Sequence, residues 1–401
     1  MKAGWEIRTL GDACSFIDYR GRTPQKVDDG LRLITAKNVK MGFLQKEPLE
    51  YVDPATYGGW MTRGIPRIGD VLFTTEAPLA NVAQLDTDER VVFAQRIIVL
   101  QPVGKDIDAT FLKYFLMSDS AQRKILQKGT GATVQGIKAS LLKKIEISFP
   151  KLAGQHRIVK ILDEAFENIA TAKANAEKNL QNARALFESH LQSIFNQTGD
   201  DWINNRIQDV CQIRPPKSEA RGIVQSFEHV SFVPMEDLCI GEKYARASKT
   251  RPLSEVDGSY TYFAEGDVLL AKITPCFENG KLGIARNLER GIGFGSSEFI
   301  VFRPNSLLCN EWLYYFLRRE RFRLEGAAQM AGAVGQKRVI KEFIENCLIP
   351  VPPISEQRRL VETLDSLVTE TRRLESIYQA KIAALDELKK SLLHQAFNGD
   401  L

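Results

Sequence analysis

The chain has 401 residues, room for two or three domains, with 44% hydrophobic and 26% charged side chains and a formal net charge of +4. This is ordinary for a soluble folded protein, and it argues against disorder and against a strongly basic tail. No apolar run approaches the ~20 residues of a membrane span. Because the six cysteines show no zinc spacing and no signal peptide opens the chain, we expect reduced thiols and a cytoplasmic location.

The first 150 residues predict a globular unit of mixed strands and helices. Short β-branched runs at 91–93 and 96–100 predict strands, and the aromatic run at 111–117 predicts a helix with an inward aromatic face. A last apolar strand is predicted at 145–150, ending in proline. We therefore place the first unit at residues 1–152.

Residues 155–195 predict one long helix, assigned to a segment at 153–198. The run has no proline, and its apolar or small side chains recur at alternating steps of four and three, as in a helix with one buried seam. At ~1.5 Å per residue such a helix is roughly 60 Å long. The predicted seam includes Ile158, Leu162, Ala165, Ile169 and Ala172.

The same order then returns, so the chain reads as a tandem duplication. The string GDVL at 69–72 recurs at 266–269, and Gln155 is matched by Gln357, 202 residues later. A second globular unit is predicted at 199–354, with a strand at 299–302, an aromatic helix at 311–323 and a last strand at 347–353. A second long helix follows at 355–401, with a seam at Leu360, Leu364, Leu367, Leu385, Leu388 and Leu392.

The repeat predicts the fold class: α+β, with two mixed globular units separated by two long antiparallel coiled-coil helices related by an internal pseudo-twofold repeat. The first seam is rich in alanine and the second in leucine, so large side chains can fill the space that small ones leave. Two unrelated helices, each covering a core, would not explain the common register.

We find no convincing catalytic or metal-binding motif. The phosphate-binding GxxxxGK[ST] loop is absent. The adenine methyltransferase string, Asn/Asp-Pro-Pro-aromatic, is also absent, and its nearest counterpart is RPPK at 214–217. Three of the four histidines lie on the long helices without an evident nucleophile or carboxylate partner. The sequence therefore predicts a protein that is not an enzyme by itself.

Several strings resemble the specificity subunit of a type I restriction–modification system, and the resemblance covers the whole chain. In the first unit they are GRTP at 21–24, GDVLFTTEAP at 69–78 and the Gly-x-x-x-Gln turn at 131–135. In the second they are ITPCFENGK at 273–281, GSSEFIV at 295–301 and the turn at 332–336. The second unit has RPPK where GRTP is expected, so its entry loop is expected to differ.

The resemblance implies that each unit is a target recognition domain reading one half of a split, asymmetric double-stranded DNA sequence. It also implies that the long helices fix the gap between half-sites and bind two modification (methyltransferase) subunits, which carry S-adenosylmethionine. Restriction subunits would add DNA translocation and cleavage with ATP and Mg. No cofactor is expected in this chain.

Polar and basic loop residues are the candidates for DNA contact, because Arg and Lys bind phosphates or guanine edges and Asn suits adenine. In the first unit we select Tyr19, Arg20, Arg22, Thr23, Lys37, Asn38 and Arg96. In the second unit we select Arg214, Lys217, Arg221, Lys272, Thr274, Asn279 and Lys281. Each could instead be a solvated surface group or a structural turn residue.

Two other functions stay open from the residues. The chain could be the recognition half of a fused restriction–methylation enzyme, in which case the catalytic motifs would lie outside it. It could also be a coiled-coil scaffold that binds only protein, although that function gives no reason for two full globular units.

Overall fold

The computed structural model describes residues 4–19, 24–131, 135–197, 199, 201–333, 335–398 and 400–401. Its contacts divide the chain into two compact units. Unit 1 comprises Met1–Glu177 with Gln379–Leu401, and unit 2 comprises Lys178–Tyr378. This grouping differs from the four segments expected from the sequence, 1–152, 153–198, 199–354 and 355–401, which stay a prediction about independent domains.

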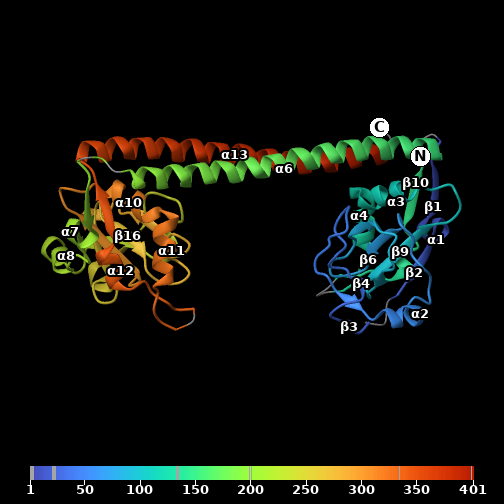
Figure 1. Cartoon of the computed structure of the whole chain (residues 1–401), viewed down its shortest axis with the longest axis horizontal. Helices are drawn as coiled ribbons and strands as arrows, with labels where there is room; N and C mark the ends of the chain where they lie inside the picture. Colours follow the sequence, from blue (N-terminus) through green and yellow to red (C-terminus); the bar gives the residue numbers. More distant parts are fainter. Residues whose placement is uncertain are drawn as a thin grey trace. The chain divides into compact units, whose positions relative to one another are not determined.

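Unit 1 contains two four-stranded sheets and a two-stranded ladder (Figure 1). One sheet has the order β2-β9-β6-β7, the other β3-β5-β4-β8, and β1 pairs antiparallel with β10. The strands are β1 Glu6–Thr9, β2 Cys14–Asp18, β3 Lys26–Val27, β4 Leu31–Ile34, β5 Tyr51–Val52, β6 Val71–Thr74, β7 Val82–Gln84, β8 Val92–Phe93, β9 Ile97–Pro102 and β10 Glu146–Phe149. The helices are α1 Leu10–Ala13, α2 Tyr57–Trp60, α3 Ala109–Met117, α4 Asp119–Lys128, α5 Ala139–Leu142 and α6 Leu152–Asn196, which continues into unit 2.

Unit 2 repeats this plan, with sheets β12-β19-β16-β17 and β14-β13-β18-β15 and the ladder β11-β20. Its strands are β11 Ile203–Arg206, β12 Cys211–Ile213, β13 His229–Val233, β14 Lys249–Pro252, β15 Thr261–Ala264, β16 Val268–Ala271, β17 Leu282–Ile284, β18 Ile292–Gly295, β19 Phe299–Pro304 and β20 Leu348–Val351. Its helices are α7 Ile207–Val210, α8 Ser218–Ile223, α9 Leu253–Val256, α10 Asn310–Arg318, α11 Glu320–Ala328, α12 Lys341–Asn346 and α13 Ile354–Asn398, whose last part belongs to unit 1. The predicted strands and the aromatic helix at 111–117 are present. The aromatic stretch at 311–323, predicted as one helix, is divided between α10 and α11 because Arg319 adopts a non-helical backbone conformation.

The recurring Gly-Asp pair is a turn that starts a core strand in each unit. Gly69 and Gly266 adopt φ of +86° and +85°, a region that side chains with a Cβ rarely enter. The following carboxylates, Asp70 and Asp267, accept the backbone N–H three residues earlier at 2.7 and 2.8 Å. The motif is therefore structural in both copies.

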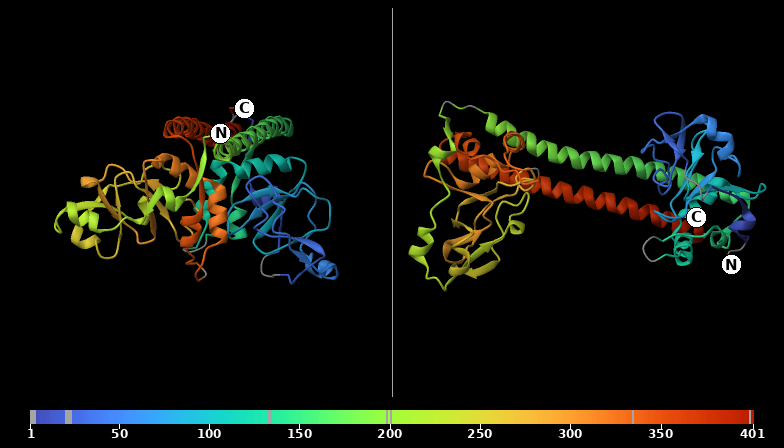
Figure 2. Two further views of the ribbon diagram at one scale, coloured as in Figure 1. Left: turned by 60° about the vertical axis from the view of Figure 1, so that its left-hand side comes forward. Right: turned by 90° about the horizontal axis from the view of Figure 1, so that it is seen from below.

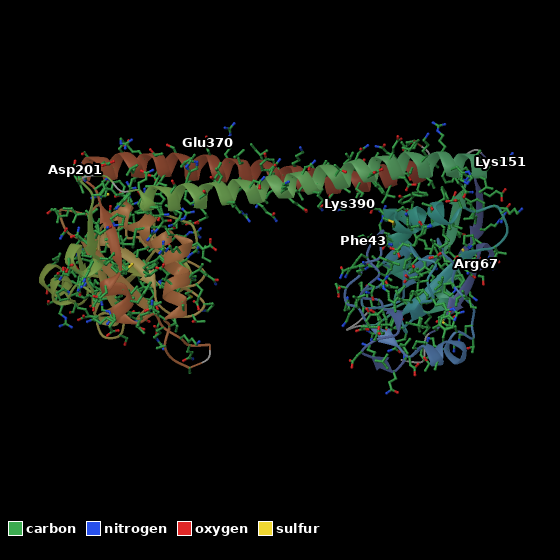
Figure 3. The ribbon with its side chains drawn as sticks, in the orientation of Figure 1. Phe43, Arg67, Lys151, Asp201, Glu370 and Lys390 are labelled. Atoms are coloured by element: carbon green, nitrogen blue, oxygen red, sulfur yellow. The ribbon has the colours of Figure 1, made fainter. Side chains whose placement is uncertain are left out.

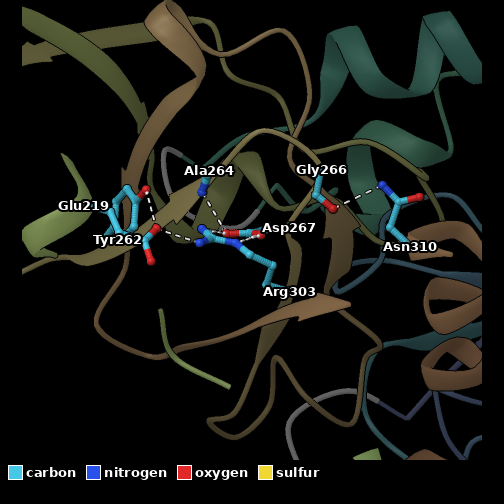
Figure 4. Close-up of polar contacts among 7 residues, drawn as sticks. All are labelled: Glu219, Tyr262, Ala264, Gly266, Asp267, Arg303 and Asn310. Carbon is cyan, nitrogen blue, oxygen red and sulfur yellow. Dashed lines mark hydrogen bonds and ion pairs between the residues drawn. The ribbon is translucent and has the colours of Figure 1, made fainter. Parts of the chain in front are cut away.

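In unit 2 this turn is fixed by a half-buried ion cluster centred on the buried Asp267 (Figure 4). Arg303 donates to both carboxylate oxygens of Asp267 at 2.8 Å and to Glu219 at 2.6 Å, and Tyr262 also donates to Glu219. The bidentate contact to Asp267, which is 1% exposed, raises the pKa of Arg303. Since Glu219 lies on α8, the cluster connects that helix to β16 and β19.

The two long helices run antiparallel, and each unit shows this within itself. In unit 1 the first part of α6 contacts the last part of α13, where Lys173 pairs with Asp386. In unit 2 the last part of α6 contacts the first part of α13, where Arg184 pairs with Glu375. Within each unit the two ribbons lie side by side (Figure 2), as expected for an antiparallel pair.

The helix ends belong to the cores of the globular parts. Ile158 and Leu162 of α6 join Leu393 and Ala396 of α13 in the main core of unit 1. In unit 2 the main core likewise includes Phe187 and Leu191 of α6 together with Leu360 and Leu364 of α13. Outside the seam the helices carry solvated charges, for example Glu370 and Lys390 (Figure 3).

Burial follows the predicted seam in α6 and departs from it in α13 at Leu388. Ile158, Leu162 and Ile169 are buried, and Ala165 and Ala172 are half-buried. In α13 Leu360 and Leu364 are buried, and Leu367, Leu385 and Leu392 are half-buried. Leu388, however, is 47% exposed. The adjacent Lys389 takes its place, with its ammonium 4.9 Å from the ring centre of Phe166, because a lysine can bury its aliphatic stem and keep its charge accessible.

Candidate nucleic-acid interface

The first candidate region lies in unit 1, where the loop before β9 meets the end of β6. Arg96 has a backbone φ of 84°, and its carbonyl accepts from Thr75 N at 2.8 Å. Its guanidinium pairs with Glu76 at 2.9 Å, and both side chains are nearly half exposed. The turn therefore holds an accessible arginine in a defined direction.

Two neighbouring pockets share Gln95 and Arg96. One of about 300 Å³ also includes Glu76, Thr130 and Lys138 in its lining. The other includes Lys37 and Lys26. The structure thus brings together two of the predicted residues, Lys37 and Arg96, and adds Lys138, which sequence reasoning missed.

The backbone just before Lys138 is hydrogen-bonded to itself and to Thr75, the residue that follows β6. Thr130 and Gly136 exchange backbone hydrogen bonds at 2.8 and 2.9 Å, and Ile137 N donates to Thr75 O at 2.9 Å. These bonds hold the ends of the turn that contains the Gly-x-x-x-Gln string, whose residues 132–134 lie outside the described part of the chain.

The equivalent region of unit 2 has the same backbone pattern and more charge. Ala331 and Arg338 exchange backbone hydrogen bonds, Val339 N donates to Lys272 O, and Lys272 N donates to Glu298 O. Arg338 binds the Glu298 carboxylate through two nitrogens at 2.7 and 2.9 Å. Lys272 Nζ lies 3.8 Å from the same carboxylate and donates to Ser297 O.

Two cations, Arg338 and Lys272, therefore flank the Glu298 carboxylate in unit 2, and the charge of a third, Arg214, acts on Lys272. The hydrogen bonds from Arg338 lower the pKa of Glu298, so this carboxyl is ionised at neutral pH. Burial lowers the pKa of Lys272, the charge of Glu298 opposes this shift, and the charges of Arg214 and Arg338 add to it.

Arg214 and Lys272 were predicted from the sequence and lie in this cluster, whereas Arg338 was missed. Arg338 and Lys138 both follow the Gly-x-x-x-Gln turn within three residues. A basic residue just after that turn in both repeats was the available signal.

Two predicted DNA contacts are wrong because their side chains are buried. Asn38 is 0% exposed: its carbonyl oxygen accepts from Thr35, and its amide donates to the carbonyls of Gln45, Lys46 and Pro48. Tyr19 is 4% exposed and donates its hydroxyl to Gly64 O, and burial raises its pKa to about 12. Both residues hold loops in place.

The remaining candidates of unit 2 are tied to their own loops. Lys217 donates to the carbonyls of Asp257 and Gly258, and Arg221 pairs with Asp257, so both hold α8 against that turn. Lys281 donates to Met235 O, and Thr274 donates to Glu278.

Asn279 is exposed. Of the unit 1 candidates, Arg20, Arg22 and Thr23 lie outside the described residues. For all of these, DNA contact stays a prediction.

Comparison with known proteins identifies the family of this chain. A family model described as "Type I restriction modification DNA specificity domain" matches residues 2–181 and 199–383, once for each repeat. The chain belongs to this family.

Among curated relatives, the EcoEI specificity subunit of Escherichia coli is 36% identical over 198 residues, covering 49% of this chain and 32% of that protein. The EcoAI specificity subunit of Escherichia coli is 31% identical over 233 residues, covering 57% of this chain and 39% of that protein. The chain thus spans less than half the length of these relatives. The EcoKI specificity subunit of Escherichia coli K12 is 23% identical over 427 residues, covering 100% of this chain and 90% of that protein.

Solved structures share the fold. A chain from a study titled "Structural basis underlying complex assembly and conformational transition of the type I R-M system" matches with a TM-score of 0.74 and 21% identity, covering 100% of this chain and 99% of that one. The HsdS subunit from Thermoanaerobacter tengcongensis matches with a TM-score of 0.60 and 21% identity, covering 100% and 98%. The expected fold class is thereby confirmed.

Proposed function

We propose that this chain is the DNA-reading subunit of a type I restriction–modification complex and that its two basic clusters contact the DNA. The cluster of unit 1 comprises Lys37, Arg96 and Lys138. The cluster of unit 2 comprises Arg214, Lys272 and Arg338. The observation that carries the proposal is the occurrence of a basic cluster at the equivalent turn of each repeat, within the two segments that match the DNA specificity family.

Two globular units with different recognition residues would suit a DNA target made of two unlike half-sites. Arg96 of unit 1 and Glu298 of unit 2 occupy equivalent positions before β9 and β19, so the two units offer different donors and acceptors. Equivalent major-groove faces recur about every 34–36 Å along B-DNA. A helix of 45 residues, roughly 68 Å at ~1.5 Å per residue, is long enough to set such a spacing.

The long helices are also the proposed attachment site for two modification subunits, which would carry S-adenosylmethionine. Exposed apolar side chains on them support this: Leu186 is 58% exposed, Ile377 48% and Leu388 47%. Restriction subunits would supply ATP- and Mg-dependent cleavage. Among the described residues no group of three or more His, Cys, Asp or Glu could hold a metal, and no helix is long and apolar enough to cross a membrane.

The DNA-binding test removes the unit 2 cluster in the complex with modification subunits. Mapping methylated adenines in cells with and without this chain first identifies the target. Replacing Arg214, Lys272 and Arg338 together by alanine is then expected to weaken binding to that duplex by at least tenfold. The slope of log affinity against log salt should fall by about 0.9 for each phosphate that the variant no longer neutralises.

The matched control replaces Arg246, Lys249 and Arg321, exposed cations paired with nearby carboxylates, by alanine. It removes the same charge and should leave affinity within about twofold. Equal weakening in both variants would contradict a local interface. Methyl transfer by the chain alone would favour a fused enzyme, and no DNA affinity in the complex would favour a protein-only scaffold.

A further inference from the structure

Two ion pairs connect the long helices, and the positive and negative partners are distributed between the helices in the same way in both. In unit 1 Lys173 Nζ lies 2.7 and 2.8 Å from the two carboxylate oxygens of Asp386. In unit 2 Arg184 Nε lies 2.6 Å from Glu375 Oε1. In both pairs α6 supplies the cation and α13 the carboxylate.

The internal repeat shows why this polarity matters. The offset of 202 residues that carries Gln155 onto Gln357 carries Lys173 onto Glu375 and Arg184 onto Asp386. The two ion pairs are therefore equivalent positions with opposite charges. Two α6 helices paired in the same antiparallel register would place Lys173 opposite Arg184, and two α13 helices would place Glu375 opposite Asp386. Like charges repel in both cases.

Side-chain size also differs between equivalent positions of the two helices in the middle of the seam, small on α6 and large on α13. The offset carries Ala176 onto Tyr378 and Ala183 onto Leu385. The register set by the ion pairs puts Ala176, 2% exposed, beside the turn that carries Leu385, and Ala183, 8% exposed, beside the turn that carries Tyr378. Two α6 helices would instead bring alanine near alanine and leave a gap, and two α13 helices would bring tyrosine near leucine and crowd the seam.

We infer that the helix pair selects unlike partners, α6 with α13, and rejects a second copy of either helix. The surface that α6 offers fits a helix with large apolar side chains and two flanking carboxylates, and the surface of α13 fits the reverse. Every assembly built from these helices then contains one of each globular unit. The inference does not depend on DNA binding, and its tests contain no DNA.

The direct test starts from the folded full chain with a protease site inserted between α6 and β11. After cleavage the N-terminal fragment, with α6, stays bound to the C-terminal fragment, with α13. The fragments are separated in urea and returned to native buffer, and native mass spectrometry measures the complexes. Unlike complexes should exceed like complexes by about tenfold. A statistical mixture, half of it like complexes, would overturn the inference.

A charge exchange provides the matched variant. Arg184→Glu with Glu375→Arg keeps the unlike ion pair but makes both like pairings attractive, because Lys173 then faces a glutamate and Asp386 an arginine. The excess of unlike complexes should fall several-fold, and an unchanged excess would show that charge does not set the choice.

A second measurement needs no reassembly. In the uncleaved chain Lys173→Glu with Arg184→Glu should lower the melting temperature by a few degrees. Adding Glu375→Lys and Asp386→Lys should restore it. A chain in which reversal on one helix has no effect, or in which reversal on both fails to restore the melting temperature, contradicts the charge pairing.

Discussion

Each long helix is attached near its start to the preceding globular part by one buried glutamine, Gln155 in α6 and Gln357 in α13. Gln155 is 0% exposed, accepts from Asp108 N at 2.9 Å and donates to the carbonyls of Asp106 and Pro150. Gln357 makes the same three bonds, to Cys309 N and to the carbonyls of Leu307 and Pro352. The matching glutamines were visible in the sequence, but their purpose was not, because two of the three partners of each lie about fifty residues earlier in the chain.

Gln155→Leu should therefore destabilise unit 1 by about 2–4 kcal/mol, since a buried polar group left without a partner costs about 1–3 kcal/mol. Urea unfolding followed by the fluorescence of Trp5 and Trp60 measures this, with Trp202 and Trp312 replaced by phenylalanine. Gln395→Leu, at an exposed position of α13, is the control and should change stability by less than about 0.5 kcal/mol. Equal effects would mean that the buried bonds are unimportant.

The equivalent thiols Cys14 and Cys211 begin β2 and β12 and are 3% and 6% exposed. Burial raises the pKa of each to about 12. Only the thiolate is nucleophilic, so neither should react with a disulfide reagent at pH 8 in the native chain. Mass spectrometry of labelled peptides should find them modified only after unfolding, with the partly exposed Cys239 as the native-state control. Rapid native labelling of Cys14 would contradict this.

Among the elements, the long helices were the easiest to predict and their seam was not. A 45-residue pattern without proline leaves no alternative to a helix, and two copies in one register imply a pair. The side that faces the partner drifts, however, because 3.6 residues per turn does not match a seven-residue repeat. Towards the end of α13 this drift turns Leu388 away from α6 and brings Lys389 towards it. A prediction from hydrophobicity alone selects the leucine.

Leu364→Asp and Leu388→Asp test the corrected seam. Leu364 is 0% exposed in the core of unit 2, so a buried carboxylate there should lower stability by about 3–5 kcal/mol and prevent helix pairing. Leu388→Asp should cost less than about 1 kcal/mol, as is usual for an exposed position. Circular dichroism during thermal unfolding compares the two. Similar destabilisation by both substitutions would return Leu388 to the seam.

At the scale of the whole molecule, the duplication and fold class were predictable, but the division into compact units was not. Hydrophobic period identifies a long helix without saying which globular part buries its ends. Leu393 and Ala396 lie in the core of unit 1, almost 300 residues from the aromatic helix α3 of that core. Contacts between segments so distant in sequence leave no local signal. The basic clusters were predicted only in part. Arg214 and Lys272 were identified, but Arg338 was not, because only the folded chain brings it close to Lys272.

Leu393→Asp should therefore weaken unit 1 although the substitution lies near the end of the chain. Hydrogen exchange measured by mass spectrometry is expected to rise at least tenfold in α3 and stay unchanged in α10 of unit 2. His394→Asp, on the exposed side of the same turn, is the control. Faster exchange in α10 alone would contradict the assignment of the helix end to unit 1.

The placement of the final helix end also sets an order of completion during synthesis. Unit 2 is one continuous segment, Lys178–Tyr378, and all of it leaves the ribosome before Gln379–Leu401. The N-terminal part of unit 1 is translated first but lacks Gln379–Leu401 until those residues have been made. Domains usually mature from the N-terminus onward. Here the earlier-made part of unit 1 keeps an apolar face exposed until Gln379–Leu401 have emerged from the ribosome. A nascent chain stalled before that segment would present this face to chaperones.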